Sequence, residues 1–488
     1  MHFPRAGRTP PGRAALNPTK EYEMKAASII SIREKRGAPQ LWLENLATER
    51  SGFVPGATFI VTPYRKGVLL SLAEDGGRRV SKKDRGTRVV PVIDINAREA
   101  LAPIADYEAV RVVYGERMIY VAPLASEIRR LRRLARLRAH LAQSSLDTAG
   151  LACGGGVMTH AVHAGLSDAG LGARTLMFNE IRADLAEHAM AHNDALSADT
   201  VIANLPLQEL AFDEEVMRRM PEVDLLEMGL PCSGASRAGK AKNKNALPED
   251  HPLVGYLIAG AIAVTAKLNP AVVIAENVPL WGSSASAAIL RGQLRDLGYQ
   301  VSERVLDATD WGEMEARKRW FMVAVTEGIA FDFEAMMPKR YPIRYLAEIM
   351  EEIPDDDPRW SPMQYLRDKE VRDRNRGANF KMQLFDGSEI HIGTLTKGLQ
   401  KRRSTDPMFQ HPERPELLRL PTVTEHARCK GIPEHLVTGL SQTKGHELLG
   451  QSIAYGPVRA IAAHLGQALR AFAETEVRAR KTTFACAA

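Results

Sequence analysis

Short apolar runs alternate with helical stretches from Leu146 onward, and this alternation restricts the fold more than any other feature of the sequence. Four runs have the length and composition of buried strands: residues 175–178, 224–228, 272–275 and 321–325. Strands separated by stretches long enough for a helix pair in parallel, with helices on both faces of the sheet. The sequence therefore predicts a doubly wound, Rossmann-like α/β domain. Ligands of such sheets bind at the carboxyl ends of the strands.

The sharpest local feature is a Pro-Cys loop directly after one of these predicted strands. Pro231 precedes Cys232, and Ser236 follows four residues later. A cysteine on a loop beyond a strand end can be exposed and activated, although a lone cysteine is more often an inert buried residue. The flanking proline and serine favour the reactive thiol.

Two further segments place charged side chains beside predicted strands. One buried strand ends in Glu276 and Asn277, which puts a carboxyl group at its carboxyl end. Arg317 and Arg319 directly precede another strand, and Glu315 stands two residues before them. A glycine-rich loop opens the α/β region, and its glycines allow the backbone to approach a ligand closely.

Taken in order, these segments resemble the motifs of the DNA cytosine-5 methyltransferases. The Pro-Cys loop matches P-C-x-x-x-S, the next strand end matches E-N-V, and the arginine pair matches Q-x-R-x-R except for Glu315. Residues 419–433 resemble R-x-L-T-x-x-E-x-x-R-x-x-G-F-P, and residues 450–453 resemble G-N-x-V. The resemblance covers about residues 146–470. It implies an S-adenosylmethionine-dependent methyltransferase domain that acts on a flipped-out cytosine.

The resemblance implies a covalent mechanism. Cys232 would add to C6 of cytosine and so make C5 nucleophilic. Glu276, as a protonated acid, would bond the ring N3 and the exocyclic amine, while Arg317 would hold the O2 atom. Arg319 takes the loop-anchoring role that the second arginine has in the family. The predicted catalytic residues are Cys232, Glu276, Asn277, Arg317 and Arg319.

The resemblance also implies a cofactor site around the glycine-rich loop. Cys153 replaces a glycine of the family pattern there, and Leu151 replaces a phenylalanine. Glu180 is spaced to bind the ribose hydroxyls, and Ile181 to lie against adenine. Asn204 stands where the family has an aspartate for the adenine amine, so we expect weakened cofactor binding. The predicted cofactor-binding residues are Leu151, Cys153, Gly155, Gly156, Glu180, Ile181, Asn204, Pro231 and Ser452.

A β-rich pattern that repeats about 52 positions apart precedes the catalytic motifs. Strands are expected at residues 39–43, 58–61, 68–70, 91–95, 110–113 and 118–121. About forty residues of the pattern resemble the swapped-hairpin DNA-binding proteins of the AbrB type. A small β domain used for packing or dimerisation fits the pattern equally well.

A basic helix is predicted over residues 126–143, with one apolar face that includes Leu131. Its arginines are Arg129, Arg130, Arg132, Arg133, Arg136 and Arg138. Clustered arginine is typical of nucleic-acid binding, so the helix is either a solvated linker or a phosphate-contacting helix.

The expected domains are a tail (1–24), a duplicated β-rich domain (25–125), a basic linker helix (126–143), a catalytic domain (144–330), a target-recognition region (331–415), the C-terminal part of the catalytic domain (416–475) and a second tail (476–488). Met24 is an alternative start of the chain. The target-recognition region is rich in Arg, Lys and Asp, and nothing in it spells out a recognition sequence.

Composition adds only broad limits. The net charge of +6 permits a polyanionic partner without requiring one. The four cysteines contain no C-x-x-C pair, which argues against a zinc ribbon, and we expect no metal site. Four scattered thiols in a chain of this length indicate a reducing compartment. With no membrane segment apparent, we expect a cytoplasmic protein. The expected partner is double-stranded DNA, while a restriction endonuclease partner and self-association through the N-terminal domain stay open.

Two alternatives remain at this stage. A tRNA cytosine-5 methyltransferase would share the fold. A catalytically weak, DNA-binding regulator on the same fold is suggested by the changed residues Cys153, Asn204 and Glu315.

Overall fold

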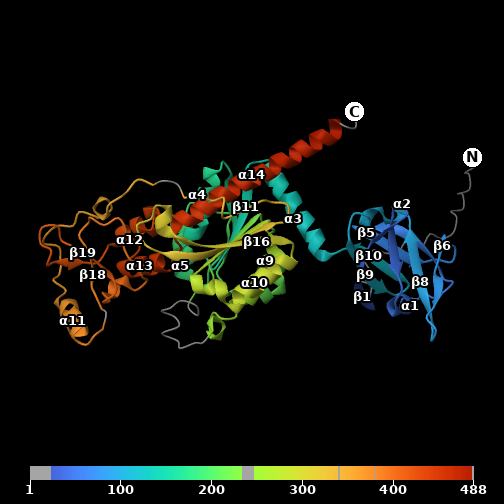
Figure 1. Ribbon diagram of the computed structural model, residues 1–488, viewed down its shortest axis with the longest axis horizontal. Coiled ribbons are helices and arrows are strands. Elements are labelled where there is room, and N and C mark those ends of the chain that lie inside the picture. The colour runs from blue at the N-terminus through green and yellow to red at the C-terminus, as the bar shows by residue number, and fades with distance from the viewer. Residues whose placement is uncertain (1–22, 233–246, 339–340, 379, 486–488) are drawn as a thin grey trace, which may run out of the picture. The chain divides into compact units, whose positions relative to one another are not determined.

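The computed structural model describes residues 23–232, 247–338, 341–378 and 380–485. Ser236, which the sequence analysis named, and Cys486, one of the four cysteines, lie outside these ranges. The chain divides into two compact units, residues 1–128 and 129–488, and each is considered by itself (Figure 1). No described helix is both long and apolar enough to cross a membrane.

The first unit consists of antiparallel β-structure around one apolar core. Its six-stranded sheet has the order β1-β9-β10-β5-β4-β6, and its four-stranded sheet has the order β2-β3-β8-β7. The strands are β1 (Ala26–Ser31), β2 (Arg33–Lys35), β3 (Ala38–Leu43), β4 (Thr58–Tyr64), β5 (Gly67–Leu72), β6 (Arg78–Arg79), β7 (Ser81–Asp84), β8 (Val89–Asn96), β9 (Ala109–Gly115) and β10 (Met118–Pro123). All six predicted strand segments fall within these strands. The pattern of β-branched runs between turn residues therefore predicted six of the ten strands correctly.

The two sequence copies pair with each other through equivalent strands. β3 of the first copy pairs antiparallel with β8 of the second, and Trp42 lies opposite Asp94, its counterpart 52 positions later. β5 pairs in the same way with β10. Equivalent strands that pair antiparallel are related by a local two-fold axis, so the duplication closes into one symmetric unit within a single chain.

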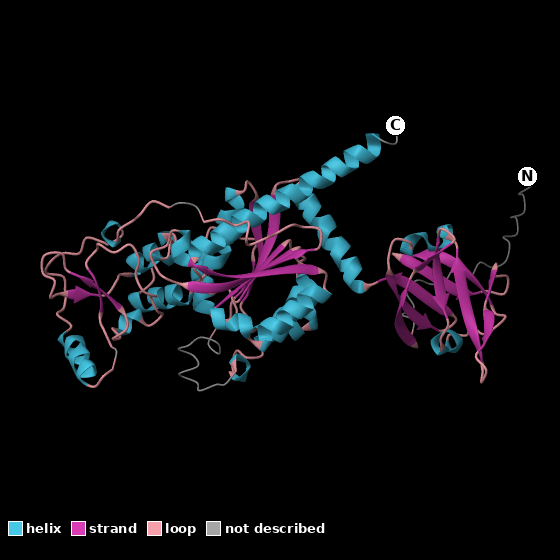
Figure 2. Ribbon diagram, viewed as in Figure 1, coloured by secondary structure: helices cyan, strands magenta, loops and turns pink. Residues whose placement is uncertain are grey.

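The second unit is built on a seven-stranded sheet with the order β13-β12-β11-β14-β15-β17-β16 (Figure 2). Its strands are β11 (Ser145–Leu151), β12 (Gly172–Asn179), β13 (Val201–Ala203), β14 (Leu225–Met228), β15 (Val272–Asn277), β16 (Tyr299–Asp307) and β17 (Lys318–Thr326). Successive strand residues face opposite sides, so Leu225 joins one core and Leu226 the other. One core includes α3 (Ala125–Leu141), α4 (Val157–Asp168) and α14 (Tyr455–Ala485), and the other includes α6 (Leu207–Phe212), α9 (Leu257–Leu268) and α10 (Ala285–Asp296). The doubly wound α/β fold is confirmed.

The sheet is not parallel throughout, which corrects one expectation. β17, which contains the predicted strand 321–325, runs antiparallel to both β15 and β16. Only residues 308–317 separate β16 from β17, and a parallel crossover needs a dozen or more residues. The chain therefore turns back directly after β16 and fills the position beside β15.

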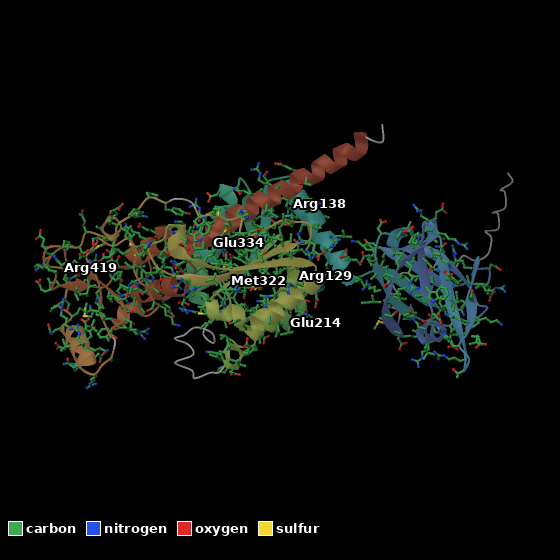
Figure 3. The ribbon with its side chains drawn as sticks, viewed as in Figure 1. Arg129, Arg138, Glu214, Met322, Glu334 and Arg419 are labelled. Carbon is green, nitrogen blue, oxygen red and sulfur yellow. The ribbon has the colours of Figure 1, made fainter. Side chains whose placement is uncertain are left out.

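Several arginines of α3 form hydrogen bonds with other groups of the second unit, to which they belong. These bonds argue against a helix whose arginines contact phosphate. Arg133 is 1% exposed; its guanidinium donates to Thr326 Oγ1 at 2.8 Å and to the carbonyls of Leu297 and Gly298 at 2.7 and 2.8 Å. The Arg136 guanidinium donates to Glu222 at 2.8 Å. Arg129 and Arg138 stand toward opposite ends of the helix (Figure 3), and Arg129 donates to the carbonyl of Ala266 at 2.6 Å.

The predicted apolar face of this helix also needs one change. Leu134, Leu137 and Leu141 are buried as expected, but Leu131 is 38% exposed. Arg133 takes the buried position because its planar fork satisfies several carbonyls at once. Its guanidinium also lies over the ring of Tyr299, 3.9 Å from the centroid.

We expect Arg133→Met to lower the free energy of unfolding by about 3 kcal/mol, because two carbonyls and a hydroxyl lose a buried donor. Arg132→Met is the matched control: Arg132 is 64% exposed and pairs with Glu222, so its loss should cost under about 1 kcal/mol. Urea unfolding of the full chain measures both. Equal losses would show that α3 does not depend on its buried arginine.

A smaller lobe interrupts the second unit between β17 and α12 (Val423–Cys429). It contains α11 (Gln364–Asn375) and a three-stranded sheet, β18 (Gln383–Phe385), β19 (Pro407–Gln410) and β20 (Leu418–Arg419). Arg419, labelled in Figure 3, is buried and forms a bidentate pair with Glu425 at 2.7 Å for both bonds. This pair ties the end of the lobe to the first turn of α12.

Candidate active site

The predicted site residues gather at one edge of the seven-stranded sheet. The glycine-rich loop follows β11, Glu180 follows β12, Asn204 follows β13, and Cys232 follows β14. Glu276 and Asn277 end β15. These five strands are mutually parallel, so their carboxyl ends lie along the same edge, where sheets of this type bind ligands.

Asn277 holds the loop that carries Cys232. Its side chain is 2% exposed and donates from Nδ2 to the carbonyl of Leu230 at 3.0 Å. Its Oδ1 accepts from the backbone N–H of Val278 at 2.9 Å. Both of its polar atoms therefore have partners in the protein. Asn277 is a positioning residue for the Pro-Cys loop rather than a group that faces a ligand.

Cys232, Glu276 and Arg319 interact electrostatically with one another at this edge of the sheet. Arg319 Nε lies 3.0 Å from Glu276 Oε1, and Cys232 is half-buried. Burial raises the pKa of the Cys232 thiol, and the carboxylate of Glu276 raises it further, while Arg319 and Arg317 act in the opposite direction. Burial also raises the pKa of Glu276, against the effect of Arg319. A carboxylate with a raised pKa takes up a proton more readily than an exposed one does.

The two arginines have partners that differ from those expected of the roles in the sequence analysis. Arg317 is 3% exposed, and its guanidinium donates to the carbonyls of Gly450 and Ser452, both at 3.0 Å. It therefore anchors the loop before α14 and does not face the ligand side. Arg319, expected to be the anchor, is the arginine beside Glu276. Strand alternation does not explain the difference, because residues two positions apart share a face of a strand. Arg317 precedes β17, whereas Arg319 lies within it, and the local sequence does not show which partner each arginine meets.

Glu315 and Lys430 form a buried ion pair that the sequence analysis missed. Both side chains are 0% exposed, with Lys430 Nζ 3.3 Å from Glu315 Oε2. Burial alone would raise the pKa of Glu315, but Lys430 and Arg317 hold it below its usual value. Burial lowers the pKa of Lys430 to about 7. The sequence signal for this pair was Glu315, which replaces the glutamine of the family pattern. A carboxylate that becomes buried requires a nearby cation, so this replacement indicated a cationic partner elsewhere in the chain.

The glycine-rich loop is held by Glu180. The N–H of Gly154 donates to Glu180 Oε2 at 2.7 Å, and the N–H of Arg182 donates to Oε1 at 2.9 Å. Gly156 has a φ of 76°, and a Cβ there would lie 2.4 Å from Asn193 Nδ2. A side chain on Gly155 would lie 2.4 Å from Leu448 Cδ1. The loop therefore requires its glycines to pack closely.

Two of the substituted residues turn away from the ligand side. Leu151 is 1% exposed and belongs to the sheet core, which corrects its place among the cofactor contacts. The Cys153 thiol points back at β11: a Cβ on Gly150 would lie 2.4 Å from its Sγ and 2.8 Å from Glu227 Oε1. The expected intrusion of the Cys153 side chain toward the ligand is therefore not what the structure has.

The remaining predicted cofactor-binding residues differ in exposure and in whether their polar atoms already have partners. Ile181 is 63% exposed, which is unusual for an isoleucine and leaves an apolar surface at the end of β12. Asn204 donates from Nδ2 to the carbonyl of Glu180 at 2.7 Å, which leaves its Oδ1 as an acceptor. Pro231 is exposed. The Ser452 hydroxyl donates to the carbonyl of Leu449 at 2.7 Å, so its side chain caps its own turn.

Comparisons with known proteins show the family and the fold of this chain. The family described as "C-5 cytosine-specific DNA methylase" matches residues 161–467. The chain is 27% identical over 257 residues to "Type II methyltransferase M.MspI" of Moraxella sp, a match that covers 51% of this chain and 58% of that protein. It is 24% identical over 320 residues to "Type II methyltransferase M.NlaX" of Neisseria lactamica, covering 63% and 97%. Among solved structures, the S. pombe Dnmt2 methyltransferase superposes with a TM-score of 0.51 at 18% identity, covering 66% and 98%, and shows the fold alone.

Proposed function

Because the chain belongs to the family of C-5 cytosine-specific DNA methylases, we propose that it methylates cytosine in double-stranded DNA with Cys232 as its nucleophile. The observation that carries this proposal is the position of Cys232. It lies on the loop after β14, and its thiol is electrostatically coupled to Glu276 and Arg319. A nucleophile, an acid and a cation at one strand edge are the groups that this chemistry needs.

The proposed reaction starts with addition of the Cys232 thiolate to C6 of the cytosine. Protonated Glu276 donates to N3, so that negative charge does not build up on the ring as the S–C6 bond forms. Arg319 donates to O2, the role first given to Arg317. The resulting enamine carries its electron density at C5. After methylation, a base such as water takes the C5 proton as the S–C6 bond breaks, so the thiolate leaves. N3 returns its proton to Glu276, and the neutral aromatic ring is restored.

S-adenosylmethionine supplies the methyl group to C5 when it is bound. The chain's own residues fit this cofactor: Gly155 and Gly156 pack against Leu448 and Asn193, and open space beside Gly154 leaves the backbone of the loop accessible to a ligand. Exposed Ile181 offers a surface for adenine, and Asn204 Oδ1 remains as an acceptor for its amine. Because this acceptor is retained, we expect the change from aspartate to asparagine to weaken cofactor binding less than the sequence analysis suggested. One Glu180 oxygen already holds the loop, and its carboxylate retains lone pairs for ribose hydroxyls.

The lobe within residues 331–415 is proposed to choose the target sequence. It is tied directly to the arginine segment: the N–H of Leu395 donates to Glu315 Oε1 at 2.8 Å, and Thr394 Oγ1 donates to the carbonyl of Ala316 at 2.8 Å. Through Glu315 and Arg317, the lobe and the loop before α14 share one buried charge network. DNA bound by the lobe would therefore be positioned relative to Cys232.

Bisulfite sequencing of DNA from cells that express the chain tests the activity. We expect protected cytosines within one short sequence context, and none in cells that express Cys232→Ser. Methyl transfer to duplex DNA and to tRNA, assayed side by side, separates the two nucleic acids. Transfer to tRNA alone would overturn the DNA assignment. A dedicated restriction endonuclease partner and a cytoplasmic location stay predictions.

The first unit is proposed to add DNA affinity. Its equivalent strands already pair within one chain, which removes the main reason to expect self-association through this unit. Residues 81–89 of the β7–β8 hairpin are all exposed. This stretch carries Lys82, Lys83, Arg85 and Arg88. Glu44 pairs with Lys83 and Arg85, so Lys82 and Arg88 are the cations that we expect to meet phosphate. Such a cluster replaces α3 as the expected phosphate contact.

We expect Lys82→Ala with Arg88→Ala to reduce the salt dependence of DNA binding by about one to two counterions, because each phosphate contact releases about one. Binding should weaken alike for all sequences, and the methylated motif should not change. Arg295→Ala, an exposed arginine of α10, is the control. Fluorescence anisotropy across a salt series measures the slope. A slope equal to that of the wild type would leave the first unit without a DNA role.

A further inference from the structure

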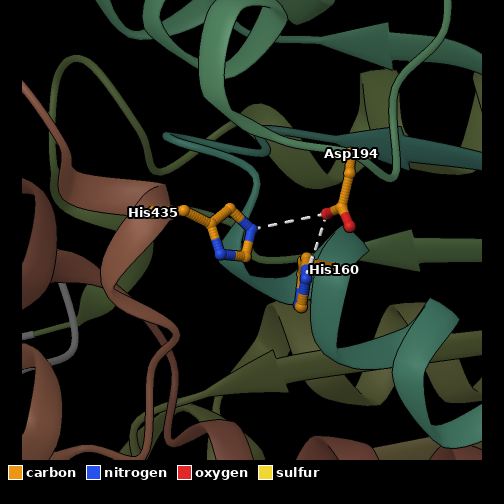
Figure 4. Close-up of side chains that lie close together, drawn as sticks. All are labelled: His160, Asp194 and His435. Carbon is orange, nitrogen blue, oxygen red and sulfur yellow. Dashed lines mark ion pairs between the residues drawn. The ribbon is translucent and has the colours of Figure 1, made fainter.

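Two histidines and an aspartate from three distant segments meet on the second unit (Figure 4). His160 lies in the first turns of α4, Asp194 follows α5 (Ala183–His192), and His435 lies in the 3₁₀ turn Glu434–Val437. Asp194 Oδ1 is 3.1 Å from His160 Nε2 and 3.4 Å from His435 Nε2. One ligand atom from each residue lies within 4.8 Å of the other two.

These separations suit a tetrahedral metal ion. Ligand atoms about 2.0–2.2 Å from Zn²⁺ lie roughly 3.3–3.5 Å from one another at the corners of a tetrahedron. Two of the three separations are within about 0.2 Å of that range without any rearrangement. The His435 side chain is 48% exposed and so has room to close the third. An imidazole, imidazole and carboxylate set, with an open side for water, matches the ligands that Zn²⁺ accepts.

His160 is oriented as a metal ligand is. Its Nδ1 is 2.6 Å from the Tyr455 hydroxyl, which leaves Nε2 directed at Asp194. Ligating histidines are usually held by a second hydrogen bond of this kind at the other ring nitrogen. Burial lowers the pKa of His160, against the opposing effect of Asp194, and so favours the neutral imidazole that binds metal.

We propose that His160, Asp194 and His435 bind one divalent transition-metal ion of the Zn²⁺ class. The sequence analysis expected no metal because it considered cysteine pairs, whereas these ligands are separated by tens to hundreds of residues. The ion fastens the turn Glu434–Val437 to α4, the helix that starts at the glycine-rich loop. His188 Nε2, 2.8 Å from the carbonyl of Leu436, already joins the same turn to α5. The site therefore acts as a structural clamp behind the loop, and it does not depend on the proposed methylation.

Metal binding is tested on the full-length chain with Zn²⁺ and Co²⁺ alone. After dialysis with Zn²⁺, elemental analysis should give about one retained ion per chain, and the midpoint of thermal unfolding should rise. His435→Ala and Asp194→Asn should each weaken Zn²⁺ binding by at least about tenfold, and Tyr455→Phe by about tenfold through the lost orienting bond. His391→Ala, at an exposed histidine in the smaller lobe, should bind as the wild type does.

Cobalt distinguishes this site from binding to cysteine. Bound Co²⁺ should show the visible d–d bands of a tetrahedral ion without a thiolate charge-transfer band in the near ultraviolet. A thiolate band would move the metal to a cysteine and overturn the assignment. So would wild-type affinity in His435→Ala and Asp194→Asn, or no Zn²⁺ retained by the wild type. In the last case Asp194 would be only a hydrogen-bond acceptor for the two imidazoles.

Discussion

Replacing Cys232 with alanine is expected to abolish methyl transfer, with kcat lowered by about 10³-fold or more. The reaction needs a nucleophile that adds to C6 and so raises the electron density at C5. Among the described cysteines, Cys232 alone lies on the loop after β14. Duplex DNA that carries 5-fluorocytosine provides the direct measurement. Fluorine at C5 cannot leave as a proton does, so the wild-type enzyme should remain covalently attached to the base, whereas Cys232→Ala should form no adduct.

The other cysteines are the matched controls for this experiment. Cys429 is fully buried, and burial raises the pKa of its thiol well above the usual value. Burial has the same effect on Cys153, reinforced by Glu227 and Glu180. Both are therefore poor nucleophiles, and Cys153→Ala and Cys429→Ala should still form the adduct. An adduct mapped by mass spectrometry to either of these thiols, or to Cys486, would contradict the assignment. Cys232 is half-buried, so Cys232→Ala should unfold at the wild-type midpoint.

Glu276→Gln is expected to lower kcat by roughly 10²- to 10⁴-fold, the usual contribution of a positioned acid. Glutamine has nearly the same shape and can still donate a hydrogen bond, but it cannot deliver a proton to N3. Burial raises the pKa of Glu276, so its carboxylate takes up a proton more readily than an exposed glutamate does. Single-turnover kinetics with duplex DNA measure the chemical step without product release. A variant with wild-type kcat would remove Glu276 from the catalytic residues.

Glu276→Gln should also change the pKa of the Cys232 thiol, which a purely structural role of Glu276 would not do. The carboxylate of Glu276 raises the pKa of the Cys232 thiol, and the cation of Arg319 lowers it. Removing the negative charge in Glu276→Gln should move the titration of Cys232 to lower pH, so alkylation by iodoacetamide becomes faster at a fixed pH below the transition. Arg319→Ala should move it to higher pH. Peptide mapping confines the measurement to Cys232, and unchanged profiles in both variants would show that the three groups are not coupled.

Local sequence was sufficient for many of the strands and for the position of the reactive thiol. Runs of β-branched and apolar residues predicted six of the ten described strands of the first unit and four of the seven in the large sheet of the second, because that preference acts between near neighbours. Pro231, Cys232, Glu276 and Asn277 could be placed at one sheet edge because parallel strands share the edge at which they end. The family resemblance, carried by short segments in order, was confirmed for the same reason: each motif is a local arrangement around a strand end.

Tertiary structure alone decided which partner each charged side chain meets. Arg317 and Arg319 are two residues apart, yet the fold buries one among carbonyls and sets the other beside Glu276. Lys430 meets Glu315 across more than a hundred residues, and Arg133 meets carbonyls more than 160 residues away. A guanidinium or carboxylate carries no local signal for its partner, because pairing depends on burial and on which segments the sheet brings together. For the same reason no local pattern predicted the convergence of His160, Asp194 and His435, which exists only once α4, the segment after α5 and the turn at Glu434–Val437 have packed against one another.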